Sequence, residues 1–437
     1  MSNSSKRPFD RTAGHHDSNN LWHFSGDHSL CLGCQDCFFR ADCGGLEVQA
    51  ALYDCTDFCR CQDPSACDNV CPNRSAAFAA RLQEIRGFNL DDIPHAPHAQ
   101  GPSLPPLIPM IYHGSRRDAP LCVDIAALPL ARVVDYSRGT IRFPNRGALL
   151  EAFKLRDGCQ VLLSGTDRDR DLENWWRLKD REVVIQGLVE LGIVLVTTPN
   201  FSLFGDVPRT DNLYNIKRIA LTWSEIQSRG LACALHLNAR TNQDWDRWLQ
   251  FLKAHPEVDV VAFEFGTGAG FEQRILWHVD QLRHLALQLE RPMHLIVRGG
   301  VHVLPRLAAA FSSIALIDTR PFVKTYRRQR GIAVDGRLRW TKAPTRLGEP
   351  LDQLLEDNIK AATAALAPTE PILIPMAEIT RSYKTLRAAN DAGNEPLQLG
   401  LLDQPSRGKR GTGTIHGEGV IAAAESELSA EIGQSDE

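Results

Sequence analysis

Residues 193–237 decide the fold, and they read IVLVTTPNFSLFGDVPRTDNLYNIKRIALTWSEIQSRGLACALHL. An uninterrupted apolar run opens this stretch at 193–198 and another closes it at 231–237. Such runs are typical of strands that are buried on both faces of a parallel sheet. Between them, apolar residues recur at helical spacing over 212–228, as in a helix that packs on a sheet. The stretch therefore predicts one strand–helix–strand unit.

The same unit recurs on both sides of this stretch. Short apolar runs predict eight strands, at 107–112, 132–136, 160–165, 193–198, 231–237, 258–265, 293–299 and 313–318. Helical patterns separate several of them, at 171–191, 212–228, 244–254 and 271–289. This repetition predicts a TIM-like (β/α)8 barrel at 107–325, irregular near its start because the connection 115–131 contains Pro120 and Pro129. A doubly wound α/β sheet is the alternative.

The segments that flank the barrel differ from it in composition. The pair Asp335-Gly336 interrupts an alternating pattern at 331–340 and predicts the turn of a hairpin. Helices are expected at 350–366 and 377–391. Before the barrel we expect a polar, disordered N-terminus at 1–26, a Cys-rich metal-binding module at 27–90 and a Pro-rich extended linker at 91–106. After it we expect the hairpin with its helical appendage at 326–400 and a disordered tail at 401–437.

Composition limits the class of protein. The 437 residues are 43% hydrophobic and 23% charged, which excludes wholesale disorder and a fibrous protein. No apolar run approaches the roughly 18 residues that a membrane helix needs, so no membrane partner is expected. The polar start lacks the apolar core of a signal peptide, which favours a cytoplasmic location. The net charge of −4 gives no global drive toward nucleic acid.

Nine of the 12 cysteines lie within the Cys-rich module, and clustered thiols in a reducing cytosol are more often metal ligands than disulfides. Their spacing is C-x2-C-x2-C-x5-C followed by C-x3-C-x-C-x5-C-x3-C-P. Three thiols at i, i+3 and i+6, with a distant Cys before a Pro, are similar to the ligand run of bacterial ferredoxins. The pattern predicts an iron–sulfur cluster held among Cys31, Cys34, Cys37, Cys43, Cys55, Cys59, Cys61, Cys67 and Cys71.

Zinc is the alternative metal, because it takes four tetrahedral ligands that commonly come as two Cys pairs. Nine thiols allow two four-ligand sites with one Cys spare, a mixture of metals, or a redox-active or disulfide-rich element. The ferredoxin pattern also requires three residues between Cys37 and the next Cys, whereas five residues separate Cys37 from Cys43. The other cysteines, Cys122, Cys159 and Cys233, lie beside or within apolar runs and are expected to be buried core thiols.

Polar residues at the carboxyl ends of the strands are the candidate catalytic groups, since chemistry in TIM barrels takes place there. Glu264 and Asp318 alternate with apolar residues and are expected to point into the barrel mouth. Two facing carboxylates suit general acid–base catalysis, and His236 is a candidate base or anion contact. Each of the three can instead be a buried, hydrogen-bonded scaffold residue.

A phosphate site is predicted after the seventh strand, where Arg298 precedes Gly299 and Gly300. Bare glycine amides can approach an anion and arginine adds a charged fork, although the same glycines suit a turn that begins a helix. The long loop 198–212 is the best candidate for substrate binding, or else it packs the barrel end. The expected contacts from this loop and the end of the fifth strand are Asn200, Ser202, Asp206, Arg209 and Asn238.

At this loop, PNFSLFGDVPR followed by NLYNIKR resembles an uncharacterised bacterial and phage family, domain of unknown function number 4417. The resemblance covers the barrel from its fourth to its sixth strand and implies a barrel-like α/β fold, with no activity to carry over. Transglycosylases that act on guanine have similar barrels, but their zinc cysteines follow the barrel, whereas these precede it. The positions that match the family are Pro199, Phe201, Ser202, Leu203, Asp206, Pro208 and Asn215.

Two functions are compatible with these features. The first is an enzyme that acts on a phosphorylated or nucleotide-like small molecule, beside a metal cluster that relays electrons or is structural. The second is a zinc-containing nucleic-acid-binding protein without catalytic activity, although such basic runs are usually solvated faces. Its basic residues lie at 326–346, namely Arg327, Arg328, Arg330, Arg337, Arg339, Lys342 and Arg346.

Overall fold

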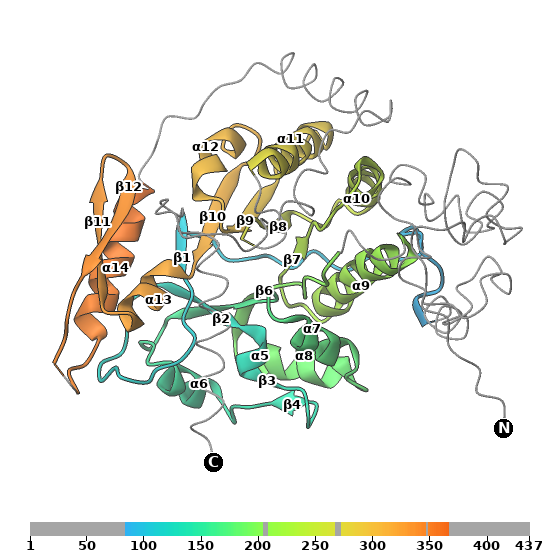
Figure 1. The fold of residues 1–437 in the computed structure, drawn as a ribbon. Helices are drawn as coiled ribbons and strands as arrows, with labels where there is room; N and C mark the ends of the chain where they lie inside the picture. The colour runs from blue at the N-terminus through green and yellow to red at the C-terminus, as the bar shows by residue number, and fades with distance from the viewer. Residues whose placement is uncertain (1–83, 204–208, 267–271, 347, 367–437) are drawn as a thin grey trace, which may run out of the picture.

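The computed structural model describes residues 84–203, 209–266, 272–346 and 348–366 (Figure 1). Eight parallel strands form one sheet in the order β1-β10-β9-β8-β7-β6-β5-β2. A parallel bridge between Met110 and Ala127 joins β1 to β2, so the predicted TIM-like barrel is confirmed. The strands are β1 (Leu107–Pro109), β2 (Ile125–Pro129), β5 (Gln160–Ser164), β6 (Ile193–Thr197), β7 (Cys233–His236), β8 (Val260–Glu264), β9 (His294–Arg298) and β10 (Ser313–Asp318).

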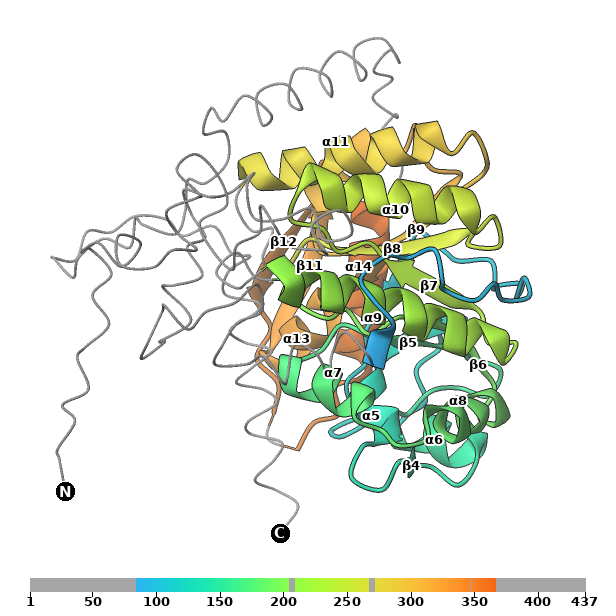
Figure 2. The same ribbon diagram turned by 90° about the vertical axis from the view of Figure 1, so that its right-hand side faces the viewer.

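Helices surround the sheet, and α9, α10 and α11 lie side by side on one flank (Figure 2). The helical pattern expected at 171–191 is two helices, because Asp180 accepts a hydrogen bond from the Val183 amide and begins a second helix there. Between barrel strands the helices are α6 (Arg146–Ala152), α7 (Asp169–Trp176), α8 (Arg181–Glu190), α9 (Arg209–Ser228), α10 (Asn242–Ala254), α11 (Glu272–Gln288) and α12 (Leu304–Leu307), followed by α13 (Arg320–Tyr326) after β10.

The second strand differs from the prediction. The barrel uses residues 125–129, whereas the expected strand at 132–136 is a short helix, α5 (Leu130–Val133), followed by β3 (Val134–Asp135), which pairs with β4 (Thr140–Ile141). The sequence of β2 is IAALP, and alanine and proline are poor strand formers by propensity. Ala127 nevertheless suits the narrow interior of an eight-stranded barrel, and Pro129 stands at the strand end.

Alanines and larger aliphatic side chains together fill the barrel interior. One buried cluster contains residues from all eight strands and includes Ala127, Ala234, Ala262 and Ala315. The alternate residues of the same strands belong to a second, larger cluster between the sheet and the helices. Because successive strand residues point to opposite faces, membership of the two clusters shows which positions face inward.

The base of the barrel, where the strands begin, is covered by the Pro-rich segment 91–106, which we call the base strap. The strap has no regular secondary structure, in agreement with the predicted extended linker. It packs along α9, where Ser224 donates to the Pro94 carbonyl at 2.8 Å. It then crosses beneath the barrel, where Ala99 and Leu104 contact the interior cluster. The segment is therefore part of the barrel's packing.

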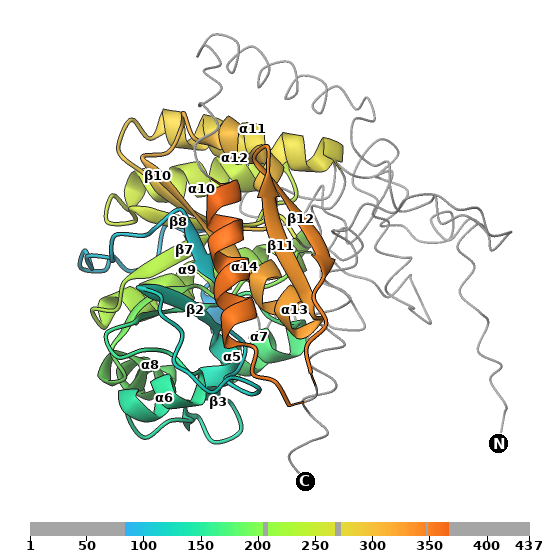
Figure 3. The same ribbon diagram turned by 90° about the vertical axis from the view of Figure 1, so that its left-hand side faces the viewer.

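The predicted hairpin and the helix after it are present, and they lie against α13 (Figure 3). Strand β11 (Gln329–Val334) pairs with β12 (Arg337–Lys342) through a turn at Asp335 and Gly336, both with positive φ. Helix α14 (Asp352–Ala365) packs on this hairpin, and its buried Asn358 accepts from the Gly331 amide at 2.7 Å. Helix α14 also contacts β1, which has no helix of its own before β2.

The predicted burial of the three isolated cysteines is confirmed for two of them. Cys159 and Cys233 are buried, whereas Cys122 is exposed. Its neighbour Leu121 is buried and forms a parallel bridge with Leu155, so the extended backbone turns the next side chain outward.

All nine clustered cysteines, residues 27–83 of the Cys-rich module, the helix expected at 377–391 and the terminal segments lie outside the described residues. Among the helices that the structure does describe, none has the length and apolarity required to cross a bilayer.

Candidate active site at the barrel mouth

Three polar side chains occupy the last inward-facing positions of neighbouring strands. Ala234, Ala262 and Ile296 belong to the interior cluster of β7, β8 and β9. Two residues further along each strand stand His236, Glu264 and Arg298. Because side chains alternate with a period of two, all three enter the barrel mouth above the apolar interior. Glu264 and Arg298 are register partners, and His236 is in register with Ala262, two residues below Glu264. The mouth is the carboxyl end of the barrel, where TIM-like enzymes place their chemistry.

Glu264 and Arg298 face each other across adjacent strands. Their Cα atoms are register partners, and Glu264 Oε2 lies 3.6 Å from Arg298 Nη1. The other carboxylate oxygen accepts from the Gly266 amide at 2.7 Å, and Glu264 is only 7% exposed. Burial strengthens the electrostatic interaction within this pair relative to the same pair at the surface. The pair therefore places an anion and a cation side by side inside the mouth.

His236 is held as a neutral ring of defined tautomer. Its Nδ1 lies 2.6 Å from the Thr198 carbonyl oxygen, which can only accept, so Nδ1 carries the proton. The lone pair is then on Nε2, which lies 3.4 Å from Thr166 Oγ1. Burial, opposed in part by the hydrogen bond to Thr198 and reinforced by the Arg298 charge, lowers the pKa of His236 to about 4. At neutral pH the ring is a hydrogen-bond acceptor at this nitrogen.

Thr166 links the histidine to the arginine, and it was not among the predicted site residues. Its hydroxyl lies beside His236, while its carbonyl oxygen accepts from Arg298 Nη1 at 3.4 Å. The sequence signal was its position directly after a barrel strand, in the run SGTD at 164–167.

Asp167, the next residue, was missed as well. Burial raises the pKa of its carboxyl group, while the Arg298 charge acts in the opposite direction. Tyr136 is close enough for the negative charge of Asp167 to add to the effect of burial, and both raise the pKa of the phenol. A half-buried carboxyl group that holds its proton more tightly than usual is a candidate general acid.

Three glycines allow the ends of neighbouring strands to approach closely. A Cβ on Gly165 would lie 2.4 Å from the carbonyl oxygens of both Thr197 and Thr198. Gly299 and Gly300 have φ values of 75° and 64°, and a Cβ on Gly300 would lie 2.7 Å from the Phe265 ring. Packing and backbone geometry therefore account for glycine at both positions of the pair. Phosphate binding by this pair stays a prediction.

The predicted substrate-binding loop is only partly described. Asn238 donates to Asn200 Oδ1 at 3.1 Å and to the Phe201 carbonyl at 3.0 Å, so the structure brings these two asparagines together. Ser202 donates to Asp169 at 2.5 Å, at the start of α7. Asp206 and the side chain of Arg209 lie outside the described part of the chain, and Arg209 is the first residue of α9.

The structure does not bring Asp318 to this group. Leu316, two residues earlier, belongs to the outer cluster, so Asp318 lies on the helix-facing side of β10. Its carboxylate accepts from the Arg320 amide and from Arg320 Nε, both at 2.9 Å. These contacts stabilise the start of α13, which makes Asp318 a buried, paired scaffold residue in this arrangement.

Comparisons with known proteins add little to this geometry. No family model and no curated protein matches the chain. One similar solved structure is that of a "putative phosphonomutase" from Burkholderia cenocepacia J2315, with a TM-score of 0.29 and 15% identity over 57% of this chain and 95% of that chain. Another is a cube-shaped, highly porous protein cage designed by fusing symmetric oligomeric domains, with a TM-score of 0.27 and 13% identity over 66% of this chain and 79% of that one. The class of protein is thus defined by the fold itself, a TIM-like barrel with a polar mouth.

Proposed function

We propose that the barrel mouth is the active site of an enzyme that acts on a phosphorylated or nucleotide-like substrate. The observation that carries the proposal is the convergence of His236, Glu264 and Arg298 at the carboxyl ends of three neighbouring strands. Buried titratable groups gathered in the mouth of a barrel are more typical of catalysis than of scaffolding.

Arg298 is the proposed phosphate contact. A guanidinium presents a planar fork of donors that matches phosphate oxygens, and the contacts of Arg298 include a 3.4 Å hydrogen bond and a 3.6 Å ion pair. A phosphate that entered the mouth would compete with Glu264 for this fork. Glu264 would then have a negative charge beside it and a weaker ion pair with Arg298. Both changes disfavour the ionised carboxylate, so Glu264 would become a stronger base. This exchange couples substrate binding to the activation of a proton acceptor.

His236 and Asp167 complete the proposed chemistry. The His236 lone pair at Nε2 can accept a hydrogen bond from a substrate hydroxyl, and a bound phosphate would favour its protonated, donating form. Asp167 has the raised pKa that suits a proton donor on the same side of the mouth.

Phosphate binding by the full chain tests the proposal. Saturation-transfer NMR with inorganic phosphate, followed by a panel of sugar and nucleoside monophosphates, should detect binding by the wild-type protein. Arg298→Ala should weaken it at least tenfold, whereas Arg306→Ala, which removes an exposed arginine from α12, should leave it unchanged. Glu264→Gln should keep phosphate binding while removing turnover of any ester found to react. Equal binding by wild type and Arg298→Ala would refute the proposed site.

We further propose that the nine clustered cysteines hold an iron–sulfur cluster, with zinc as the alternative. The support is their spacing, in particular Cys31, Cys34 and Cys37 at intervals of three. Protein purified without oxygen should be brown and contain iron and sulfide in equal amounts. Cys34→Ser should lower the iron content, and Cys122→Ser, an exposed cysteine outside the cluster, should not. A colourless protein that contains zinc would favour the alternative. The resemblance to family number 4417 likewise stays a prediction.

One observation supports nucleic-acid binding as a second candidate. In the β11–β12 register, Ile332 pairs with Arg339 and Val334 with Arg337, so both arginines share the outer, exposed face of the hairpin. Arg330 lies on the same face, two residues before Ile332. Phosphate contacts make binding steeply dependent on salt. Replacing Arg330, Arg337 and Arg339 together by Ala should abolish a salt-dependent mobility shift on RNA or DNA, while Arg306→Ala should not. The absence of any shift with wild-type protein would reject this candidate.

A further inference from the structure

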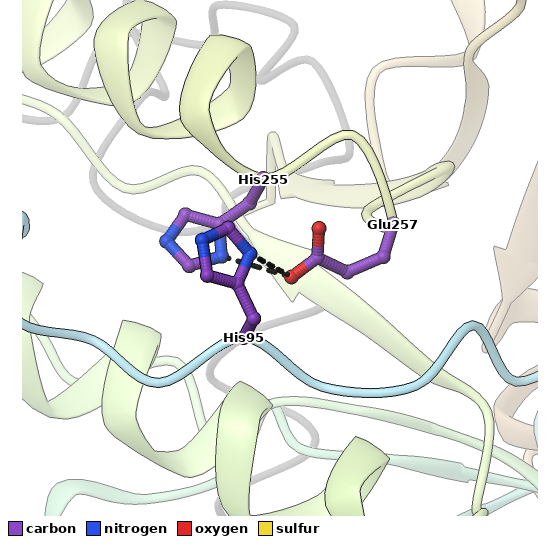
Figure 4. A group of neighbouring side chains, drawn as sticks. All are labelled: His95, His255 and Glu257. Atoms are coloured by element: carbon purple, nitrogen blue, oxygen red, sulfur yellow. Dashed lines mark hydrogen bonds and ion pairs between the residues drawn. The ribbon is translucent and has the colours of Figure 1, made fainter.

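A compact group of three ligand-type side chains lies at the base of the barrel, far from the proposed active site along the strands. His95 Nδ1 lies 2.9 Å from Glu257 Oε1, and His255 Nδ1 lies 3.0 Å from the same oxygen. Figure 4 shows the two imidazole rings stacked, with both contacts meeting at one carboxylate oxygen. His95 is 162 residues distant from Glu257 in the sequence, so the fold alone brings the group together.

Two of the three side chains stand on a rigid support. His255 ends α10, where its amide donates to the Phe251 carbonyl at 2.8 Å and its ring stacks on the Phe251 ring at 4.2 Å. The following loop, which carries Glu257, is held by Arg291, which donates to the carbonyls of Val258 and Leu252. The positions of His255 and Glu257 are therefore fixed by packing on the barrel itself.

The third side chain comes from the base strap. His95 is 68% exposed at its side chain, whereas His255 is 3% exposed. The group thus has one open side toward solvent and one closed side toward α10. This arrangement leaves room for a water molecule as a fourth ligand on the open side.

We propose that His95, His255 and Glu257 bind a divalent transition-metal ion of the zinc type, which fastens the base strap to the barrel. Two imidazole nitrogens and one carboxylate oxygen are a ligand set that zinc accepts, at bond lengths of about 2.0–2.2 Å. In a tetrahedron those bonds separate the ligand atoms by about 3.3 Å, so the present contacts need to widen by only about 0.3 Å. The exposed His95 ring on its strap can make this adjustment.

Metal binding requires a lone pair on Nδ1 of each histidine. The proton of each neutral ring then lies on Nε2, and Glu257 ligates as the carboxylate. In the metal-free form the same two Nδ1 atoms carry protons and donate to Glu257 Oε1, which also accepts from the Ala96 amide at 3.3 Å. The two forms differ in tautomer and use the same residues, so only an experiment that detects the ion distinguishes them.

The strap provides a matched control three residues further on. His98 Nε2 lies 3.0 Å from Asp259 Oδ2, which is a histidine–carboxylate pair of the same kind between the same two segments. With a single histidine and a single carboxylate, this pair is expected to act as a hydrogen bond that ties the strap. Removal of His98 therefore tests the fastening of the strap without touching the proposed ligands.

Cobalt(II) is a suitable probe because the full chain also contains cysteines that can bind metal. Cobalt bound by thiolates gives an intense charge-transfer absorption in the near ultraviolet, whereas cobalt bound by nitrogen and oxygen gives only weak visible bands. We would titrate the full-length wild type, His95→Ala, Glu257→Gln and His98→Ala with cobalt without oxygen. We would also measure their thermal unfolding with and without added zinc.

Wild type and His98→Ala should each bind one equivalent of cobalt that adds only weak visible bands and no thiolate absorption, in addition to any cobalt bound by the cysteines. Zinc should raise the unfolding midpoints of both proteins. His95→Ala should lose that equivalent, and Glu257→Gln should bind it at least tenfold more weakly, although glutamine still accepts hydrogen bonds from both rings. Thiolate absorption should be equal in all four proteins. Equal cobalt stoichiometry in the four would overturn the proposal, as would loss of the same equivalent in His98→Ala. Because this site is remote from Arg298, the phosphate-binding experiment does not depend on its outcome.

Discussion

The two ends of the barrel are built from the same eight strands, yet they differ in what caps them. At the mouth, the inward positions of β7, β8 and β9 end in His236, Glu264 and Arg298. At the base, Ala99 and Leu104 of the strap pack against the apolar interior. One end therefore carries buried polar and charged groups, and the other is covered by apolar contacts.

Histidines illustrate the difference. His236 at the mouth donates to a backbone carbonyl, which leaves a lone pair directed at Thr166. His95 and His255 at the base both contact the carboxylate of Glu257, which joins two distant segments. The mouth thus keeps an unprotonated nitrogen, which the proposed function assigns to a substrate contact, while the base uses the same residue type to join two segments of the chain. This division agrees with the rule that barrels place chemistry at the carboxyl end and stability at the other.

The largest expected effect comes from the anchor of the base strap to α9. Lys217 is fully buried and is paired with Asp92, and it also donates to the Asn89 carbonyl at 2.6 Å. Asp92→Ala would leave the buried ammonium with the Asn89 carbonyl and no counter-charge. We expect a loss of about 3 kcal/mol of unfolding free energy, the lower end for a buried pair, because the Asp92 side chain is 39% exposed. Chemical denaturation measures the loss. Asp91→Ala, at the exposed neighbouring residue, is the matched control, and equal stability of the two variants would show that the anchor contributes nothing.

At the mouth, His236 makes stability depend on pH. Its pKa of about 4 in the folded protein is below the ordinary value of 6.5, so between these values the unfolded chain binds more protons. Stability contributed by the neutral ring is therefore complete above pH 6.5 and is lost as the pH falls toward 4. The shift corresponds to about 3 kcal/mol across that window.

His236→Gln should remove this part of the pH dependence. The pKa values of His113 and His278 are also lowered, mainly by burial, to about 4 and about 3, so some acid destabilisation should remain. Denaturation curves at pH 7 and pH 4.5 for wild type, His236→Gln and the surface variant Val183→Thr measure the difference. The same slope in all three proteins would contradict the proposed neutral, buried state of His236.

The glycine pair at the mouth offers a smaller effect. Gly300→Ala would combine a positive φ with a Cβ 2.7 Å from the Phe265 ring, and we expect a loss of about 2 kcal/mol. Gly336→Ala in the hairpin has a similar φ of 68° with nothing within 4 Å, so it should cost only about 1 kcal/mol from the backbone alone. Denaturation measures the loss of unfolding free energy in both variants, and the difference between the two losses is the steric cost of the contact with Phe265. An equal cost would mean that the mouth has room to adjust around Phe265.

Sequence reasoning succeeded where the pattern is local. The runs that became β6, β8 and β9 are apolar and mostly β-branched or aromatic, and the turn at Asp335 and Gly336 is set by two residues. It failed at β2, because two alanines and a proline in IAALP are poor strand formers by propensity, and only Ala127 of the two alanines faces the interior. A strand or turn could thus be predicted where its own residues determine it, and it was missed where packing against distant residues determines it.

The same limit explains the outcome for the site. Glu264 and Asp318 each follow an alternating run, and only membership of the inner or the outer cluster shows that Glu264 faces the mouth while Asp318 faces the helices. The group of His95, His255 and Glu257 is formed by segments about 160 residues apart, so no spacing in the sequence signals it. Composition predicted an extended Pro-rich linker at 91–106, and only its contacts with the interior show where this segment packs.

The smallest effect tests the apolar seal at the base. Leu104 is partly buried against the interior cluster, so Leu104→Ala should lower the unfolding free energy by about 1–2 kcal/mol, less than for a fully buried leucine. Ser103→Ala changes the exposed neighbour and should have almost no effect on denaturation. Hydrogen exchange should be faster at the amides of β1 in Leu104→Ala, because the strap leads directly into that strand, while the amides of β8 near Glu264 keep their wild-type rates. Faster exchange at β8 as well would show that the two ends of the barrel are not independent, and the contrast between a sealed base and a reactive mouth would then fail.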